Sequence, residues 1–474
     1  MIQEKCPYVE KCGACHMGQT TYEEELIAKK ELVESHIGKY CRNIHDVAGM
    51  YYPFHYRNKV HAVFGRLKDE VIAGTYSEGT HTIVPIDNCL IEDAQASAII
   101  KTVTELVKSF KIWIYNEDTG RGVLRHVLVR KGMSTKQIMV VLVTACPEFP
   151  HKNNFVAELR KRHPEITTIV QNINEANTTM VLGERNKPLY GEGYIEDVLC
   201  GLRFRISPNS FYQVNSAQTQ VLYKKAIQAA GLTGKETVVD AYCGIGTIGM
   251  AMASKAGKVL GIELNRDAVK DAKANAKRNN LNNIHFVAAD ATEYLTSMAQ
   301  EGAKADVVVM DPPRSGSTEE FIQAVAQLAP ERVVYVSCNP ETLGRDLESF
   351  KKVKYRAVEA WPVDMFGWTN HVETVCLLSK LNVKHHIEVE ITMDELDLTA
   401  AESKATYDEI KAYVLEKFGF KVSQLYIAQI KRKCGIIERK NYNQSKKEDA
   451  KVPKCPPEKE AAIMDALKHF QMIP

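Results

Sequence analysis

The segment from Val334 to Pro340 carries a cysteine to the end of an apolar run. Val334, Tyr335 and Val336 predict a buried strand, and Cys338 follows after one serine. In open α/β sheets, ligands bind at the carboxyl ends of strands, so a thiol in this place could act as a nucleophile. Cysteine is also among the most buried residue types, and the same pattern fits a packed side chain without chemistry. Other segments must decide between these two interpretations.

A second segment, residues 237–249, predicts a strand, a glycine-bearing turn and the start of a helix. Gly244 and Gly246 would let the backbone approach a nucleoside cofactor closely. Glu263 ends the next predicted strand, where a carboxylate can accept both ribose hydroxyls, and Asp290 ends the third, within reach of an adenine. Three such positions at successive strand ends favour a nucleoside cofactor, and we prefer S-adenosylmethionine to NAD.

Three cysteines, Cys6, Cys12 and Cys15, fall within ten residues of one another. Such crowding indicates a metal site rather than unrelated thiols, because close thiolates suit zinc or an iron-sulfur cluster. A fourth ligand is needed, and Cys89 is the favoured candidate, with Cys41 as the alternative. The spacing does not choose between zinc and iron.

The remaining pattern places these segments in an α/β protein with a β-rich neighbour. After Gly201, strands expected near 237–240, 258–262, 284–288, 306–310 and 332–337 alternate with helices, which predicts a doubly wound, mainly parallel sheet. Residues 371–379 predict a last, antiparallel strand. Before Gly201, a helix over 22–40 precedes short β segments between 47 and 85, a helix near 92–110 and two further strands.

We therefore expect three parts. Residues 1–200 form a β-rich central RNA-binding domain that includes the cysteine motif, and its helix 22–40 could pack on the catalytic domain. Residues 201–380 form a Rossmann-like methyltransferase domain, and residues 381–474 a small basic, mainly helical extension. Between Lys411 and Cys455, twelve Lys or Arg stand against four Asp or Glu, which fits RNA contact or a solvated lysine-rich surface.

The composition bounds the class of protein. The 474 residues carry 61 Lys plus Arg and 59 Asp plus Glu, so any RNA site must be a local basic patch. The basic residues that are interleaved with tyrosines after residue 50 are suited to such a patch. Twelve cysteines without an export signal do not indicate a disulfide framework. With no apolar run of membrane-spanning length, we expect a cytoplasmic protein without membrane contact.

Several motifs together resemble the RNA (uracil-5-)-methyltransferase family. The resemblance covers roughly residues 5 to 380. It is closest to the branch that acts on 23S rRNA and carries an iron-sulfur cluster, without the N-terminal TRAM domain of many members. The motifs are Asp311-Pro312-Pro313-Arg314-Ser315-Gly316, Ser337-Cys338-Asn339-Pro340, His371-Val372-Glu373-Thr374, the segment 207–215 and the four cysteines.

The resemblance implies S-adenosylmethionine-dependent methylation of carbon 5 of a uridine in 23S rRNA. Cys338 would be the nucleophile that adds to carbon 6, and Glu373 the general base that removes the carbon 5 proton, so both should face one site. Cys6, Cys12, Cys15 and Cys89 would hold a 4Fe-4S cluster. The cofactor and target base would be lined by Gln213, Tyr242, Thr247, Glu263, Asp290 and Asp311.

The expected partner is 23S rRNA before ribosome assembly is complete, bound by a monomer. The nearest alternative is the same reaction at the uridine of the tRNA T-loop. A second is a non-catalytic iron-sulfur RNA-binding protein, against which intact Cys338 and Glu373 argue. A third, methylation of an adenine amino group, would need an aromatic residue where Arg314 stands. We also hypothesise that the C-terminal extension contributes RNA affinity.

Overall fold

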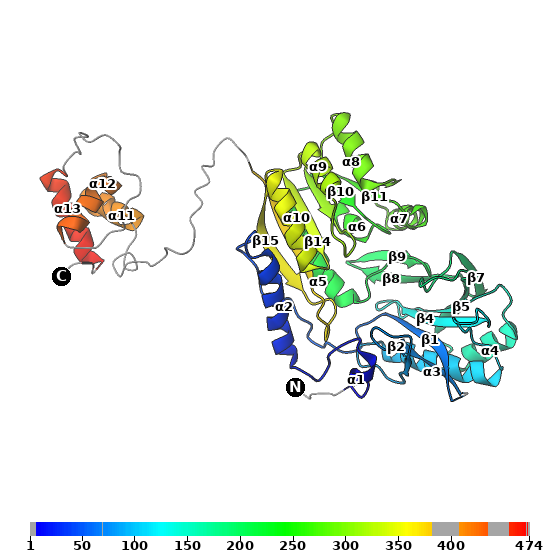
Figure 1. The fold of residues 1–474 in the computed structure, drawn as a ribbon. Helices are drawn as coiled ribbons and strands as arrows, with labels where there is room; N and C mark the ends of the chain where they lie inside the picture. The colour runs from blue at the N-terminus through cyan, green and yellow to red at the C-terminus, as the bar shows by residue number, and fades with distance from the viewer. Residues whose placement is uncertain (1–5, 69, 382–406, 435–454, 471, 473–474) are drawn as a thin grey trace. The chain divides into compact units, whose positions relative to one another are not determined.

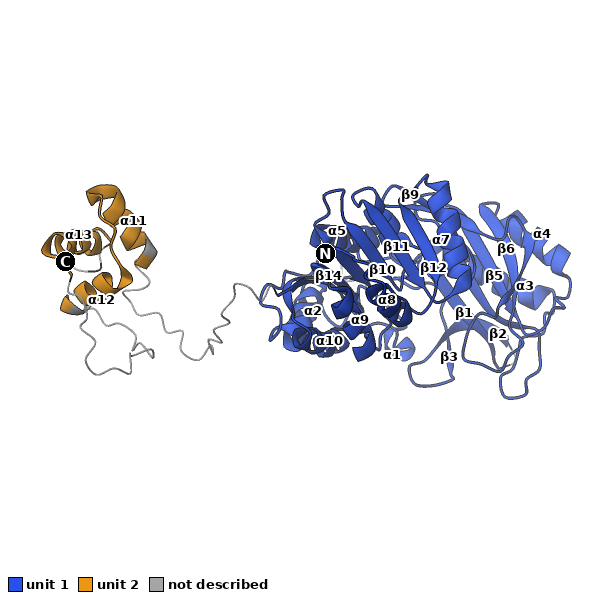
Figure 2. Cartoon of the chain, turned by 90° about the horizontal axis from the view of Figure 1, so that it is seen from above, with its two compact units in different colours: residues 1–382 blue, residues 383–474 orange. Residues whose placement is uncertain are grey.

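The structure is a computed structural model that describes residues 6–68, 70–381, 407–434, 455–470 and 472 (Figure 1). The chain forms two compact units, residues 1–382 and 383–474 (Figure 2). Part of the basic stretch after Lys411, residues 435–454, lies outside the described residues. Within the described ranges, no helix combines the length and the apolar character needed to cross a bilayer.

The first two helices are α1 (Val9–Cys12) and α2 (Tyr22–Ile37). A capping box fixes the start of α2: the Thr21 hydroxyl accepts the Glu24 N–H, and the Glu24 carboxylate accepts the Thr21 N–H. The helix ends three residues earlier than the sequence pattern predicts.

The β-rich part is a seven-stranded sheet in the order β3-β2-β1-β4-β5-β6-β7. Neighbouring strands are antiparallel except β5 and β6, which are parallel because helix α4 connects them. Helix α3 packs on this sheet over a core of Ile99, Val103, Val127 and Val129. The bounds are β1 (Lys59–Leu67), β2 (Glu70–Tyr76), β3 (Ile83–Pro85), α3 (Ala94–Ser109), β4 (Leu124–Lys131), β5 (Ile138–Thr144), α4 (Lys152–Arg162), β6 (Ile166–Ile173) and β7 (Arg185–Tyr190).

The catalytic part is a second seven-stranded sheet in the order β12-β11-β10-β13-β14-β16-β15. Strands β10 to β14 are parallel, and β16 runs antiparallel to β14, so the predicted α/β sheet and its antiparallel last strand are confirmed. The edge strand β15 was not predicted, because its first half alternates polar and apolar residues without a buried run. The bounds are β10 (Thr237–Ala241), β11 (Lys258–Glu263), β12 (Ile284–Ala288), β13 (Val307–Met310), β14 (Arg332–Ser337), β15 (Tyr355–Val363) and β16 (Glu373–Lys380).

Helices cover both faces of this sheet. One face packs against α5 (Ser216–Ala230), α6 (Thr247–Ala253) and α7 (Arg266–Arg278). The other packs against α8 (Ala291–Gln300), α9 (Glu319–Leu328) and α10 (Pro340–Lys352), and also against α2, whose Val33 and Ile37 are fully buried there. Figure 1 shows α2, drawn in blue, beside the yellow α10 despite their separation in sequence.

Between the strands of the first sheet and those of the second, the chain forms a hairpin of β8 (Ile195–Leu199) and β9 (Leu202–Ile206). Its buried residues Leu199 and Phe204 share one core with Met139 of the first sheet and Val238 of the second. The β-rich and catalytic parts therefore pack as one body, in agreement with their assignment to a single compact unit.

The second unit contains α11 (Tyr407–Phe418), α12 (Gln424–Lys433) and α13 (Pro457–His469) around Val414, Ile427 and Ile463. Gly419, with φ +70°, ends α11, and Ser423 accepts the Tyr426 N–H at the start of α12.

Candidate active site

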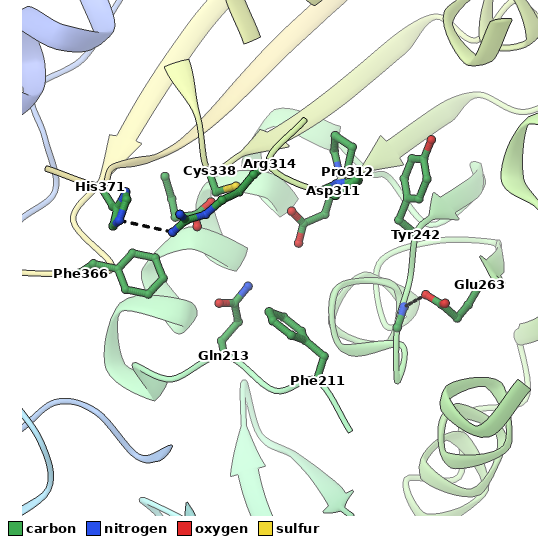
Figure 3. A pocket seen from close by; sticks show the side chains of 13 residues that line it. Phe211, Gln213, Tyr242, Glu263, Asp311, Pro312, Arg314, Cys338, Phe366 and His371 are labelled. Atoms are coloured by element: carbon green, nitrogen blue, oxygen red, sulfur yellow. Dashed lines mark hydrogen bonds between the residues drawn. The ribbon is translucent and has the colours of Figure 1, made fainter. Parts of the chain in front are cut away.

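A cavity of about 460 Å³ lies at the carboxyl ends of β10, β11, β13 and β14. Figure 3 shows that its residues form two ends. Cys338, Arg314, His371 and Phe366 lie at one end, Tyr242 and Glu263 lie at the other, and Asp311 and Gln213 stand between them. The remaining lining residues are Phe211, Gly244, Pro312, Pro313 and Glu373.

The glycine loop after β10 shapes the nucleoside end. Tyr242, Gly244 and Gly246 all have positive φ angles, of 62°, 55° and 81°. A non-glycine residue in this region is uncommon and is found preferentially at functional sites. A side chain at Gly246 would meet Phe286 at 2.5 Å, so glycine is required there for packing as well as for conformation.

Glu263 is held in place by the backbone around it. Its carboxylate accepts the Gly244 N–H at 3.0 Å and the Asn265 N–H at 2.8 Å. The remaining lone pairs can still accept the hydroxyls of a ribose. The carboxylate therefore links the glycine loop to the end of β11, as the predicted role requires.

Strand pairing brings Cys338 and Glu373 to the same end of the catalytic sheet. In the antiparallel pair of β14 and β16, Ser337 is paired with Thr374 and Val336 with Val375. Cys338 directly follows Ser337, Glu373 directly precedes Thr374, and both residues line the cavity. The two residues therefore line one cavity although 35 positions separate them in sequence, and their catalytic roles stay predictions.

The nucleophile end is rich in buried carboxyl groups. Burial raises the pKa of Cys338 to about 11, with further contributions from the Glu373 and Asp311 carboxylates, while Arg314 opposes the shift. Burial, followed by the charge of Asp311, also raises the pKa of Glu373 above its ordinary range. A raised pKa makes Glu373 a stronger base and keeps the free Cys338 protonated at neutral pH.

These shifts predict how Cys338 reacts with iodoacetamide in the free protein. Only the thiolate reacts, so the alkylation rate of Cys338 should rise roughly tenfold per pH unit from pH 7 to pH 9 without a plateau. Arg314→Gln should slow the reaction at fixed pH, because loss of the cation raises the thiol pKa further. Mass spectrometry of the Cys338 peptide measures the rate. A plateau below pH 9 would show that the thiol is not held protonated as described.

Two predicted site residues do not line this cavity. The Thr247 hydroxyl is 2.6 Å from that of Tyr223, on the side of helix α5. Asp290 is exposed and caps α8, where it accepts the Thr292 and Glu293 N–H groups. The other predicted residues, Gln213, Tyr242, Glu263, Asp311, Cys338 and Glu373, do line the cavity.

Besides Pro312 and Pro313, four further lining residues received no role from the sequence. Phe211 and Arg314 stand inside motifs that were identified, and His371 is two residues before Glu373, so proximity to a motif could have indicated them. Phe366 gave no signal, because it lies in an irregular segment between β15 and β16. Its ring packs edge-on against His371, whose Nε2 lies 3.4 Å from Arg314 Nη2.

The four predicted cluster cysteines share one neighbourhood. Cys6, Cys15 and Cys89 belong to the same apolar cluster, and Cys12 and Cys89 line a second cavity of about 330 Å³. The alternative ligand Cys41 is elsewhere, buried against Cys376. In the described ranges, no three His, Cys, Asp or Glu side chains close around a single metal ion. Cys89 therefore shares a neighbourhood with Cys6, Cys12 and Cys15, whereas Cys41 does not.

Comparisons with known proteins agree with this site. A family model described as tRNA (uracil-5-)-methyltransferase matches residues 185–381. An uncharacterized RNA methyltransferase of Halalkalibacterium halodurans is 41% identical over 80% of this chain and 84% of its own. Another, from Caldanaerobacter subterraneus, is 42% identical over 80% of this chain and 85% of its own.

A solved structure extends the match to the fold. The Pyrococcus abyssi tRNA (uracil-54, C5)-methyltransferase, in complex with S-adenosyl-L-homocysteine, has a TM-score of 0.64 and 27% identity, covering 79% of this chain and 87% of that one. The fold and these matches define an RNA methyltransferase with a Rossmann-like catalytic sheet. The chain belongs to the tRNA (uracil-5-)-methyltransferase family.

Proposed function

We propose that this protein transfers a methyl group from S-adenosylmethionine to carbon 5 of a uridine in 23S rRNA, through a covalent adduct between Cys338 and the uracil ring. The observation that carries the proposal is that one cavity is lined by Cys338, Glu373 and the glycine loop with Glu263. The bound S-adenosyl-L-homocysteine of the Pyrococcus neighbour supports the choice of methyl donor.

The chemistry follows from the weak nucleophilicity of carbon 5. The Cys338 thiolate adds to carbon 6, which converts the ring to an enolate. Carbon 5 then attacks the methyl group, and the sulfonium of the donor becomes a neutral thioether. Glu373 takes the proton from carbon 5, the bond between Cys338 Sγ and carbon 6 breaks, and the aromatic uracil is restored.

The charges of the cavity suit this sequence of steps. In the free protein, burial disfavours the Cys338 thiolate, and the nearby carboxyl groups of Glu373 and Asp311 add to this effect. A bound methyl donor would supply the positive charge of its sulfonium to the cavity, which Asp311 also lines between the two ends (Figure 3). An opposite charge nearby lowers the pKa of a thiol. Donor binding would therefore favour thiolate formation when both substrates are present.

The target uridine must leave its stack to reach Cys338. Gln213 lines the cavity next to the β-rich part. Its backbone carbonyl accepts a hydrogen bond from the side-chain amide of Asn58 at 3.0 Å. The same Asn58 amide donates to Ser216 at the start of α5. The β-rich part is thus attached directly to the cavity, which supports its proposed role in holding the RNA around a flipped base.

A second candidate substrate is the tRNA T-loop uridine. The observation in its favour is the solved neighbour, which acts on uracil 54 of tRNA. We prefer 23S rRNA because the cysteine motif resembles that of the rRNA-directed branch.

The deciding experiment incubates the protein and methyl-labelled S-adenosylmethionine with unmodified 23S rRNA and unmodified tRNA in separate reactions. Labelled 5-methyluridine in the rRNA alone is the expected result. Label in the tRNA alone would assign the T-loop substrate instead. Label in neither RNA would reject the proposed reaction.

We also propose that Cys6, Cys12, Cys15 and Cys89 hold a 4Fe-4S cluster, which would order the N-terminal segment and supply no redox step. Their shared neighbourhood beside β1 and β2 supports this assignment. Protein purified without oxygen should contain about four iron and four sulfide ions per chain. Cys89→Ser should lose most of this iron, whereas Cys41→Ser should retain it. Equal iron loss in the two variants would refute the ligand set.

A further inference from the structure

A buried group of charges lies between α2 and the segment 364–371, outside the residues used for the reaction. Lys29 Nζ donates to Glu25 Oε1 at 2.6 Å, to Asp364 Oδ1 at 2.6 Å and to the Phe366 carbonyl at 3.1 Å. The three charged side chains are at most 3% exposed. All three donors of the ammonium group are therefore satisfied in one geometry.

A buried group of charges such as this one is not expected to add much to the free energy of unfolding. Moving ions from water into the protein interior is costly, and replacing a buried ion pair by apolar residues is often neutral or stabilising. The directional bonds of an ammonium group do, however, specify the position of the groups that it contacts. Two of the three acceptors of Lys29 belong to the segment 364–371.

Other side chains and backbone groups hold the same segment. Glu25 accepts the Trp368 N–H at 2.7 Å, and Tyr22 donates to Asp364. The further bonds to this segment are Tyr56 hydroxyl to Gly367 carbonyl, Asn215 amide to Met365 carbonyl, Gln218 amide to Asp364 carbonyl, Trp368 indole to Pro53 carbonyl, and His16 N–H to Trp368 carbonyl. The segment is therefore bonded along most of its length.

This segment forms one wall of the active-site cavity. Phe366 and His371 line the cavity, and Glu373 follows at the start of β16. Figure 3 places Phe366 and His371 beside Arg314 and Cys338, at the nucleophile end. The glycine loop and Glu263, at the nucleoside end, come from β10 and β11 and do not contact this network through any of the bonds above.

We propose that Lys29 is a positioning residue for uracil methylation: with Glu25 and Asp364 it holds the segment 364–371 so that Phe366, His371 and Glu373 meet the target base. Helix α2 thereby acts on the uridine end of the cavity and not on the methyl-donor end. The inference rests on the proposed function for the reaction that it serves.

The test compares Lys29→Met with Lys30→Met, which removes the same charge one residue away. Lys30 is partly exposed and pairs with Asp46 at the surface, so its loss should leave the segment 364–371 unchanged. Lys29→Met should increase amide hydrogen exchange in 364–371 at least tenfold and lower kcat for RNA methylation at least tenfold. The Kd for S-adenosylmethionine should stay within twofold. Lys29→Arg, which keeps the charge, should recover part of kcat.

Three results would overturn the proposal: unchanged exchange in 364–371, unchanged kcat despite faster exchange, or a parallel loss of methyl-donor affinity. If Lys29→Met does not fold, the double variant Lys29→Met and Glu25→Gln, which removes one charge of each sign, is judged by the same criteria. Hydrogen exchange requires no activity. A wild-type protein that methylates no RNA would reject the proposed function, and the exchange result would still decide whether Lys29 holds the segment.

Discussion

Cys338→Ala is expected to abolish uridine methylation, lowering kcat by about 10⁴-fold or more, because no other group in the cavity can activate carbon 5 by addition to carbon 6. Binding of S-adenosylmethionine should persist, since Glu263 and the glycine loop are unchanged. The measurements are transfer of labelled methyl groups to RNA and calorimetric titration of the methyl donor.

Cys146→Ala is the matched control for this variant. Cys146 is a free thiol of intermediate exposure that follows β5, away from the cavity lining. Its substitution should leave kcat within twofold. Substantial methylation by Cys338→Ala would exclude the covalent route, whatever the control shows.

Glu373→Gln is expected to stop the reaction after methyl transfer. A glutamine cannot take the carbon 5 proton, so the methylated uracil should stay attached to Cys338 and form a protein-RNA complex that survives denaturing electrophoresis. Turnover should fall about 10² to 10⁴-fold, the usual contribution of a positioned base. The complex should carry label from the methyl donor.

Glu341→Gln, which alters an exposed carboxylate in the first turn of α10, should turn over normally and leave no such complex. The double variant with Cys338→Ala should also form no complex. Normal turnover by Glu373→Gln would assign the base to another group, with Asp311, a lining carboxyl group that acts electrostatically on both Cys338 and Glu373, as the candidate.

The alternation of catalytic strands with helices, and the sheet edge at which the side chains after these strands meet, were predictable. Continuous apolar runs such as Val307–Met310 are buried on both faces of a parallel sheet and give a strong signal. Since parallel strands end at one edge, Glu263, Asp311 and Cys338 had to lie near one another. Strand β15 was missed because an edge strand has a solvent-facing half that carries polar residues.

For the predicted cofactor residues, the sequence pattern did not show which side chains reach the cavity. Thr247 and Asp290 follow the expected strands, but their side chains are engaged by Tyr223 and by the first turn of α8. Such local hydrogen bonds leave no trace in residue spacing. The spacing of Gly244, Gly246 and Gly249 also matches dinucleotide-binding loops, so the glycines alone do not separate S-adenosylmethionine from NAD.

The 364–371 wall could not have been predicted, because it depends on contacts between residues more than 300 positions apart, such as Lys29 with Asp364. A buried lysine in a helix has the same local pattern as an exposed one. Only the packing of α2 on the catalytic sheet makes Lys29 part of the active-site architecture.

The pairing of β14 with β16 has a consequence for how this enzyme can vary. The hydrogen-bond ladder of β14 and β16 ends at Ser337 and Thr374, the neighbours of Cys338 and Glu373, so it brings these two residues to one end of the sheet whatever the length of the chain between them. Insertions in the turn between α10 and β15 should therefore be tolerated. A shift of the ladder by one residue would turn Glu373 to the opposite face of the sheet and remove it from the cavity.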